Sequence, residues 1–185
     1  ATIGTSPTMI YFGQEVGEPG KEDAGFGTHS RTSIFDYIGV PHHQRWMNNG
    51  KFDGGQLSQQ EKDLRDFYKR LLNFTLSSPA LMGNFQEIQS ANRYITEGYE
   101  PGIYSYVRWS DAQKLIVVTN FSWITTSNFQ LKVPADVIAK MGIKDGHYDL
   151  TDQLYGQSIV KLHVHGGVGA VQVSIKPSES FIFEV

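Results

Sequence analysis

The spacing of apolar residues changes near residue 83, and this change divides the chain into two parts. Before residue 83, one long segment repeats apolar side chains at helical spacing. After it, apolar and polar residues alternate with a period of two over short segments separated by turn residues. The pattern therefore predicts a mainly β chain with a helical segment in front of the β part.

Residues 58–76 give the clearest helix signal. Ser58 and Glu61 match the S-x-x-E capping box that starts many helices, and Pro79 follows the segment and prevents its continuation. The apolar face at i, i+3, i+4 and i+7 spacing consists of Leu64, Phe67, Tyr68, Leu71, Leu72 and Thr75. The opposite face is charged, so we expect one buried and one solvated side.

Eight short strands are expected after residue 83. They are residues 84–88, 103–109, 114–120, 128–133, 147–149, 158–164, 169–175 and 180–183. Segments this short, separated by Gly, Pro, Asp and Asn, are typical of an antiparallel β-sandwich or open barrel. We predict an antiparallel β-sandwich of about eight strands, with one helical turn at 135–141.

The N-terminal stretch has a different character. Residues 9–12 are apolar and end at Gly13, which predicts a short strand buried in a parallel sheet. A long glycine-rich stretch follows and predicts an irregular loop. The order strand, loop, helix resembles one unit of a (β/α)8 barrel, so we expect a barrel remnant at 1–82 and a β domain at 83–185.

Composition narrows the classes of function. The chain has 185 residues, whereas a complete (β/α)8 barrel typically needs about 250. The net charge is -3 without a cluster of Lys and Arg, which argues against a nucleic-acid partner. The longest aliphatic run, residues 115–118, is too short for a membrane-spanning segment. The absence of cysteine excludes disulfides and thiolate metal sites.

Four motifs resemble the α-amylase family, glycoside hydrolase family 13. The segment SPTMIYFGQEVG at 6–17 is similar to the last barrel strand of the family. The segment LRDFYKRLL at 64–72 is similar to its last barrel helix. The residues PAL and Gly83 that follow are similar to the start of its C-terminal β domain. RTSIFDY at 31–37, running on to QRW at 44–46, resembles an arginine-containing loop of the family. YVR at 106–108 with LIVVTNFS at 115–122 resembles a hairpin of the β domain.

The resemblance implies that the whole enzyme acts on α-glucans such as starch or maltooligosaccharides and requires no cofactor. It also implies a periplasmic or secreted location. The family's G-x-R-x-D and N-H-D motifs, which hold its catalytic aspartates, do not occur in this chain. Because retaining glycosidases need two carboxyl groups about 5 Å apart, we expect no hydrolysis by the chain alone. An unpaired strand at 9–12 would also favour self-association.

Candidate substrate contacts lie at two places. Gln14 and Glu15 follow the presumed barrel strand, at the face where barrels of this kind keep their active sites, so they either contact substrate or brace neighbouring loops. Trp109 and Trp123 lie at strand ends and either stack on sugar rings or pack in the core. A β domain that binds glucan through exposed aromatic residues is therefore the alternative to a structural one.

Two further patterns have ordinary explanations. His163 and His165 alternate on one strand, but no third ligand at a suitable spacing follows, so the sequence predicts no metal site. The glycine-rich run at 166–169 lies between two strands rather than before a helix, and predicts a hairpin turn rather than a phosphate site.

Overall fold

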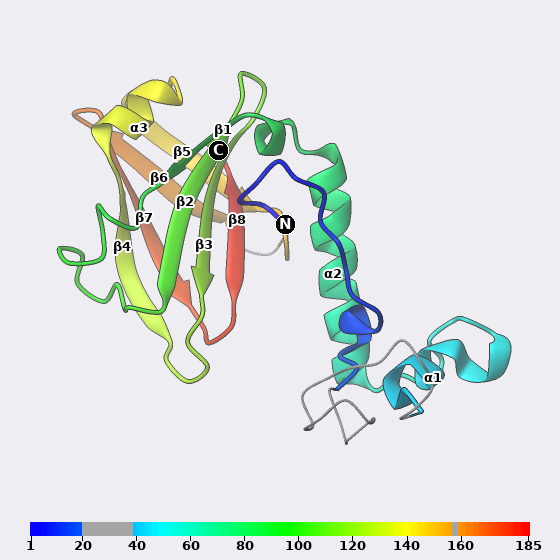
Figure 1. The fold of residues 1–185 in the computed structure, drawn as a ribbon. Helices are drawn as coiled ribbons and strands as arrows, with labels where there is room; N and C mark the ends of the chain where they lie inside the picture. Colours follow the sequence, from blue (N-terminus) through cyan, green and yellow to red (C-terminus); the bar gives the residue numbers. More distant parts are fainter. Residues whose placement is uncertain (20–38, 157–158) are drawn as a thin grey trace. The chain divides into compact units, whose positions relative to one another are not determined.

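A computed structural model describes residues 1–19, 39–156 and 159–185 (Figure 1). The chain forms two compact units. We call the first the helical unit, which comprises Ala1 and residues 6–73, and the second the β unit, which comprises residues 2–5 and 74–185. The division falls inside a helix, whereas the domain boundary expected from the sequence, after residue 82, stays a prediction.

The helical unit contains short helical elements and most of one long helix. The elements in chain order are the 3-10 helix η1 (Gln14–Val16), the helix α1 (Pro41–Met47), the 3-10 helix η2 (Asn48–Gly50) and the helix α2 (Gln59–Ser77). The helix predicted at 58–76 is thus confirmed as α2. The helix α1 was not predicted.

The start of α2 has the geometry of the predicted capping box. The backbone N–H of Ser58 donates to Glu61 Oε2 at 2.7 Å, and the N–H of Glu61 lies 3.3 Å from Ser58 Oγ. The side chains predicted to face inward, Leu64 through Thr75, are half-buried, and the charged positions between them are exposed apart from Arg65. None of the described helices is long and apolar enough to cross a membrane.

The strand predicted at residues 9–12 is wrong for this structure. These residues form no strand, and the side chains of Met9 and Tyr11 are 85% and 46% exposed. A parallel strand is stable only when neighbouring strands accept and donate its backbone hydrogen bonds. All eight described strands pair with one another inside the β unit, so residues 9–12 have no described strand to pair with.

Part of the sequence prediction lies outside the described residues. This holds for the stretch at 31–37, for most of the long loop expected after Gly17, and for Ser158 at the start of one predicted strand.

The β unit is one curled antiparallel sheet of eight strands, which confirms the mainly β class and the predicted strand number (Figure 1). The strands are β1 (Asn84–Glu87), β2 (Ile103–Trp109), β3 (Lys114–Asn120), β4 (Ser127–Val133), β5 (Gly146–Asp152), β6 (Ile159–His165), β7 (Val168–Ile175) and β8 (Ser180–Glu184). Their order in the sheet is β1-β2-β3-β8-β5-β6-β7-β4.

One hydrophobic core fills the β unit. Ile116 and Val118 of β3 belong to the same buried cluster as Leu131 of β4 and Val171 of β7, so the two ends of the sheet pack on each other as in a sandwich. The short helix α3 (Ala135–Lys140) adds Val137 and Ile138 to this cluster. The 3-10 helix η3 (Pro79–Met82) precedes β1.

A buried arginine joins segments that are distant in sequence. Arg108, 1% exposed, donates to the backbone carbonyl oxygens of Ile3 and Leu81, and its Nε lies 3.4 Å from the carbonyl oxygen of Ala80. Burial lowers the pKa of its guanidinium. The hydroxyl of Tyr106 bonds to Thr2 Oγ1. Residues 2–5 are therefore structurally part of the β unit.

Gly83 shows why the motif that resembles the α-amylase family ends in glycine. A Cβ atom placed on Gly83 would lie 2.1 Å from the carbonyl oxygen of Trp109, far closer than any side chain tolerates. The start of β1 can approach the end of β2 this closely only because the residue has no side chain.

Candidate functional site

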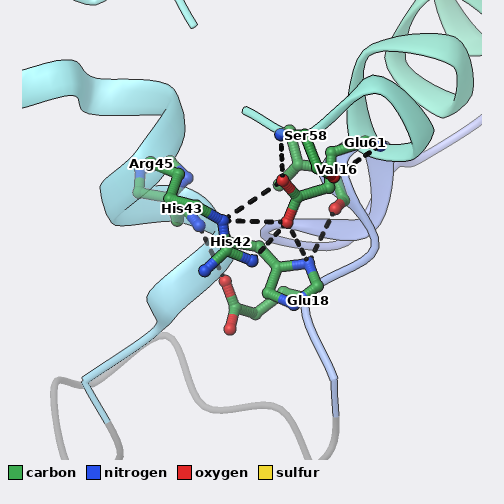
Figure 2. Close-up of polar contacts among 7 residues, drawn as sticks. All are labelled: Val16, Glu18, His42, His43, Arg45, Ser58 and Glu61. Carbon is green, nitrogen blue, oxygen red and sulfur yellow. Dashed lines mark hydrogen bonds and ion pairs between the residues drawn. The ribbon is translucent and has the colours of Figure 1, made fainter. Parts of the chain in front are cut away.

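The main polar cluster of the helical unit surrounds Glu61, in the first turn of α2 (Figure 2). Glu61 is 5% exposed and is the buried residue of that helix. The capping box explains its position, since the third helical residue points back toward the residue that precedes the helix. Elements η1 and α1 supply the side chains and backbone groups around it.

Both oxygens of the Glu61 carboxylate are engaged. Arg45 of α1 approaches side-on: its Nε lies 3.1 Å from Oε1 and 3.2 Å from Oε2, and its NH2 group donates to Oε1. His42 Nδ1 lies 2.9 Å from Oε1 and 3.1 Å from the carbonyl oxygen of Val16. This cluster therefore joins η1, α1 and α2 through charge-assisted hydrogen bonds.

The electrostatics of the cluster favour the ionised carboxylate. The hydrogen bonds from Arg45 lower the pKa of Glu61 to about 2, against the opposing effect of burial, and the Ser58 N–H and hydroxyl lower it further. Glu61 in turn raises the pKa of the Arg45 guanidinium. A general acid near neutral pH needs a carboxyl group with a raised pKa. Glu61 has the opposite property and is suited to hold α1 on α2.

A second carboxylate lies beside this cluster. Glu18, 9% exposed, accepts a hydrogen bond from the backbone N–H of His43 at 2.8 Å. Its other oxygen, Oε1, and the Nδ1 atom of His43 are buried and have no hydrogen-bond partner among the described residues. Among the described residues, these two atoms and the buried Nε of Arg65 on α2 are available to bind a further polar group.

A pocket of about 440 Å³ opens next to the cluster. It is lined by Val16, Gly17, His42, Arg45, Ser58, Gln60, Glu61 and Leu64. Its charged lining groups, Arg45 and Glu61, are paired with each other, so the pocket offers little net charge to a ligand.

The structure places the two N-terminal candidates in η1. Gln14 Nε2 donates to the hydroxyl of Tyr68 on α2 at 2.7 Å, and Gln14 Oε1 accepts from the backbone N–H of Tyr11 at 3.1 Å. Glu15 is half-buried in the same element. Gln14 thus joins η1 to α2, and substrate contact by Gln14 and Glu15 stays a prediction.

The two tryptophan candidates lie at opposite ends of a hairpin. Trp109 ends β2, pairs with Lys114, and packs against the core, while Trp123 follows β3 in a loop and is 88% exposed. Because β2 pairs antiparallel with β3 over seven residues, about 20 Å of strand separates the two ends. Trp109 and Trp123 therefore do not form one sugar-binding platform.

Sequence reasoning missed the partners of Glu61. The capping box identified Glu61 as the helix start, but neither Arg45 nor His42 has a local signal for this contact. They lie in α1, 16 and 19 residues earlier in the chain, and only tertiary structure brings them to the carboxylate. The adjacent Trp46 is also part of this arrangement, since Arg65 of α2 lies over its ring at 5.4 Å.

Comparison of the sequence with models of known families gives no match, and comparison with curated proteins gives none either. Solved structures do resemble the chain. An AmyP variant in complex with maltotriose is 21% identical, with 70% of this chain and 22% of that chain covered and a TM-score of 0.47. An Anoxybacillus α-amylase is 14% identical, with 73% and 25% covered and a TM-score of 0.45.

A maltogenic α-amylase, AmyB from Thermotoga neapolitana, gives 14% identity, 69% and 26% coverage and a TM-score of 0.45. Two of these three structures are named as α-amylases, the family that the sequence motifs resemble. The chain spans about a fifth to a quarter of the length of the proteins it resembles.

Proposed function

We propose that this chain is the C-terminal portion of an α-amylase-type glycoside hydrolase that acts on α-glucans, with a β unit whose role is mainly structural. The observation that carries the proposal is the order of four family-like motifs along the chain. A capped helix at 59–77 and an antiparallel β unit after it follow the same order. Any single motif arises by chance far more easily than the series.

The chemistry of the described carboxyl groups supports a non-catalytic role for this portion. Where a carboxyl pKa is shifted in the described residues, as at Asp53, Glu61, Asp136 and Asp145, hydrogen bonds lower it. Glycoside hydrolysis needs one carboxyl group whose pKa is raised so that it can protonate the leaving group. In this proposal, the residues that perform the chemistry belong to other parts of the whole protein.

The test compares two proteins. Residues 1–185 and the product of the whole open reading frame that contains them are purified and incubated with maltooligosaccharides, and the released sugars are separated and quantified. We expect hydrolysis by the whole product and none by residues 1–185. Hydrolysis that co-purifies with residues 1–185, or a whole product inactive on α-glucans, would contradict the proposal.

A second candidate function rests on Trp123. A tryptophan 88% exposed in a loop, with Phe121 at 66% and Ile124 at 89%, is the arrangement by which an aromatic face can stack on a pyranose ring. We propose glucan binding at this loop as the alternative role of the β unit. Exposed apolar groups gathered at one place mark binding surfaces more often than isolated ones do.

Titration with maltoheptaose, followed by tryptophan fluorescence, tests this alternative. Binding at the loop predicts a saturable change that Trp123→Ala abolishes. Tyr94→Ala is the matched control, since Tyr94 is an aromatic residue 84% exposed in a different loop. An unchanged spectrum at millimolar sugar, or equal binding by the Trp123→Ala protein, would leave the structural role as the better proposal.

A further inference from the structure

Two histidines meet across neighbouring strands of the β unit. His147 of β5 and His163 of β6 are Cα partners in the antiparallel register. Their Nδ1 atoms are 2.6 Å apart, and their rings lie nearly perpendicular, with centroids 4.6 Å apart. Sequence reasoning paired His163 with His165 along one strand, whereas the structure pairs His163 with a residue 16 positions earlier.

The pair is open to solvent on its face of the sheet. Both histidines are exposed. On one side, His163 pairs with Ala170 of β7, whose side chain is a single methyl group. On the other side, β5 pairs with β8 only at Thr151 and Asp152, so no described strand flanks His147 there. A small ion with its own water shell can therefore reach both rings.

The charges around the pair do not oppose a cation. The neighbouring cross-strand pair on one side is Asp149 and Lys161, with carboxylate and ammonium 3.4 Å apart, so the lysine charge is balanced. On the other side lie His165 and Asp145, whose carboxylate accepts hydrogen bonds from the N–H groups of Gly166 and Gly167.

We propose that His147 and His163 form a two-imidazole chelate for a divalent first-row transition cation, with Cu²⁺ bound most tightly. Neutral imidazole nitrogen suits copper, zinc and nickel, and among these Cu²⁺ gives the strongest complexes. Hard cations such as Mg²⁺ and Ca²⁺ prefer oxygen ligands and are excluded from such a site.

The geometry requires only a small adjustment. Nitrogen ligands about 2.0 to 2.1 Å from a metal in adjacent positions stand about 2.8 to 3.4 Å apart. The two Nδ1 atoms, 2.6 Å apart, reach this spacing through small rotations of exposed side chains. The chelate has two protein ligands, because the described residues contain no group of three or more His, Cys, Asp or Glu side chains arranged to hold a metal ion. Water completes the coordination.

Calorimetric titration of the intact chain with Cu²⁺ near neutral pH tests the proposal. Loss of even an outer partner of a metal site costs about 10- to 100-fold in affinity, so His147→Asn and His163→Asn should each raise Kd by at least about tenfold. His165→Asn is the matched control on the same face and should leave Kd nearly unchanged. The electron paramagnetic resonance spectrum of bound Cu²⁺ should show two nitrogen ligands in the unsubstituted chain. It should show fewer nitrogen ligands in the His147→Asn and His163→Asn variants.

Circular dichroism confirms that each exposed substitution leaves the fold intact. If both ligand variants bind Cu²⁺ as tightly as the unsubstituted chain, or if His165→Asn weakens binding equally, the assignment is overturned. The close contact would then be an N–H···N hydrogen bond between two rings and nothing more.

Discussion

The interior of the helical unit and the interior of the β unit are stabilised by different interactions. The β unit has a continuous apolar core with contributions from nearly every strand. In the helical unit, the buried apolar side chains among the described residues are Val16 and Leu57, and two of its buried side chains are the glutamates Glu18 and Glu61. Apolar burial stabilises in proportion to area, whereas ion pairs must first offset the loss of hydration. We therefore expect the β unit to be the more stable of the two.

The largest effect is expected in the β core. Leu131, on β4, is 0% exposed, and Leu131→Ala removes buried methyl groups and leaves a cavity. Such changes cost about 2 to 5 kcal/mol in free energy of unfolding, measured here by urea denaturation and circular dichroism. The control is Ile124→Ala, at a position 89% exposed, which should change it by less than about 0.5 kcal/mol. Equal effects at the two positions would show that burial in the apolar core is not what stabilises the β unit.

The next effect concerns the ion pair of the helical unit. Glu61→Gln keeps the shape of the side chain but leaves Arg45 and His42 without their anion, and we expect a loss of about 2 to 3 kcal/mol. Hydrogen exchange of the segment 41–64 should accelerate, while exchange in β2 and β3 should not change. Asp66→Asn, on the exposed side of α2, is the control. Unchanged exchange in Glu61→Gln would show that packing, not the ion pair, holds α1.

The stability of the helical unit should depend on pH in the acid range, because this unit relies on the ionised carboxylate of Glu61. The Glu61 pKa lies near 2 in the folded chain and near its ordinary value of 4.5 when unfolded. A lowered folded pKa gives stabilisation that is complete above the unfolded pKa and is lost as pH falls toward the folded one. The helical unit should therefore weaken between about pH 4.5 and 2.

Fluorescence of Trp46 reports this change in a protein whose other two tryptophans are replaced by phenylalanine. Its acid transition should be reduced when Glu61→Gln is added. A transition that is identical with and without Glu61 would assign the acid sensitivity to other groups.

The smallest effect is expected at the β6–β7 turn. Asp145 accepts hydrogen bonds of 2.8 and 2.9 Å from Gly166 and Gly167, whose φ angles of 58° and 77° are those of a tight hairpin turn. Asp145→Ala removes both hydrogen bonds and should slightly lower the free energy of unfolding, measured by urea denaturation. Asp149→Ala, which breaks an exposed ion pair on the same strand, should cost less. The reverse order would contradict the role given to Asp145.

The two units also differ in how much of them the sequence predicted. Strands β2 and β3 have the predicted bounds, because both are made of residues that are mostly buried, and alternate ones such as Ile116 and Val118 join a core that the chain itself supplies. Strand β5 continues three residues beyond its prediction. The reason is Asp152, a polar residue that is buried because its carboxylate accepts from the backbone N–H groups of Leu154 and Ile182.

The helical unit was harder to predict because its contacts are distant and polar. The helix α1 begins with Pro41 and two histidines, without an apolar period, and its position depends on Glu18 and Glu61. The strand expected at 9–12 had a correct apolar pattern but lacks a described strand to pair with. The local pattern of apolar residues indicates which face of a helix or strand is buried. It does not indicate whether another strand is present for that segment to pair with.

The contacts of Arg108 determine which residues are needed when the β unit is expressed as a separate protein. Because its guanidinium is solvated by backbone carbonyl oxygens from residues 3 and 81, the β unit is discontinuous along the chain. Expression of residues 74–185 alone would remove one acceptor from a buried cation and the threonine that bonds to Tyr106. A truncated protein that keeps the whole β unit must therefore retain the first five residues. A short linker can join them to residues 74–185.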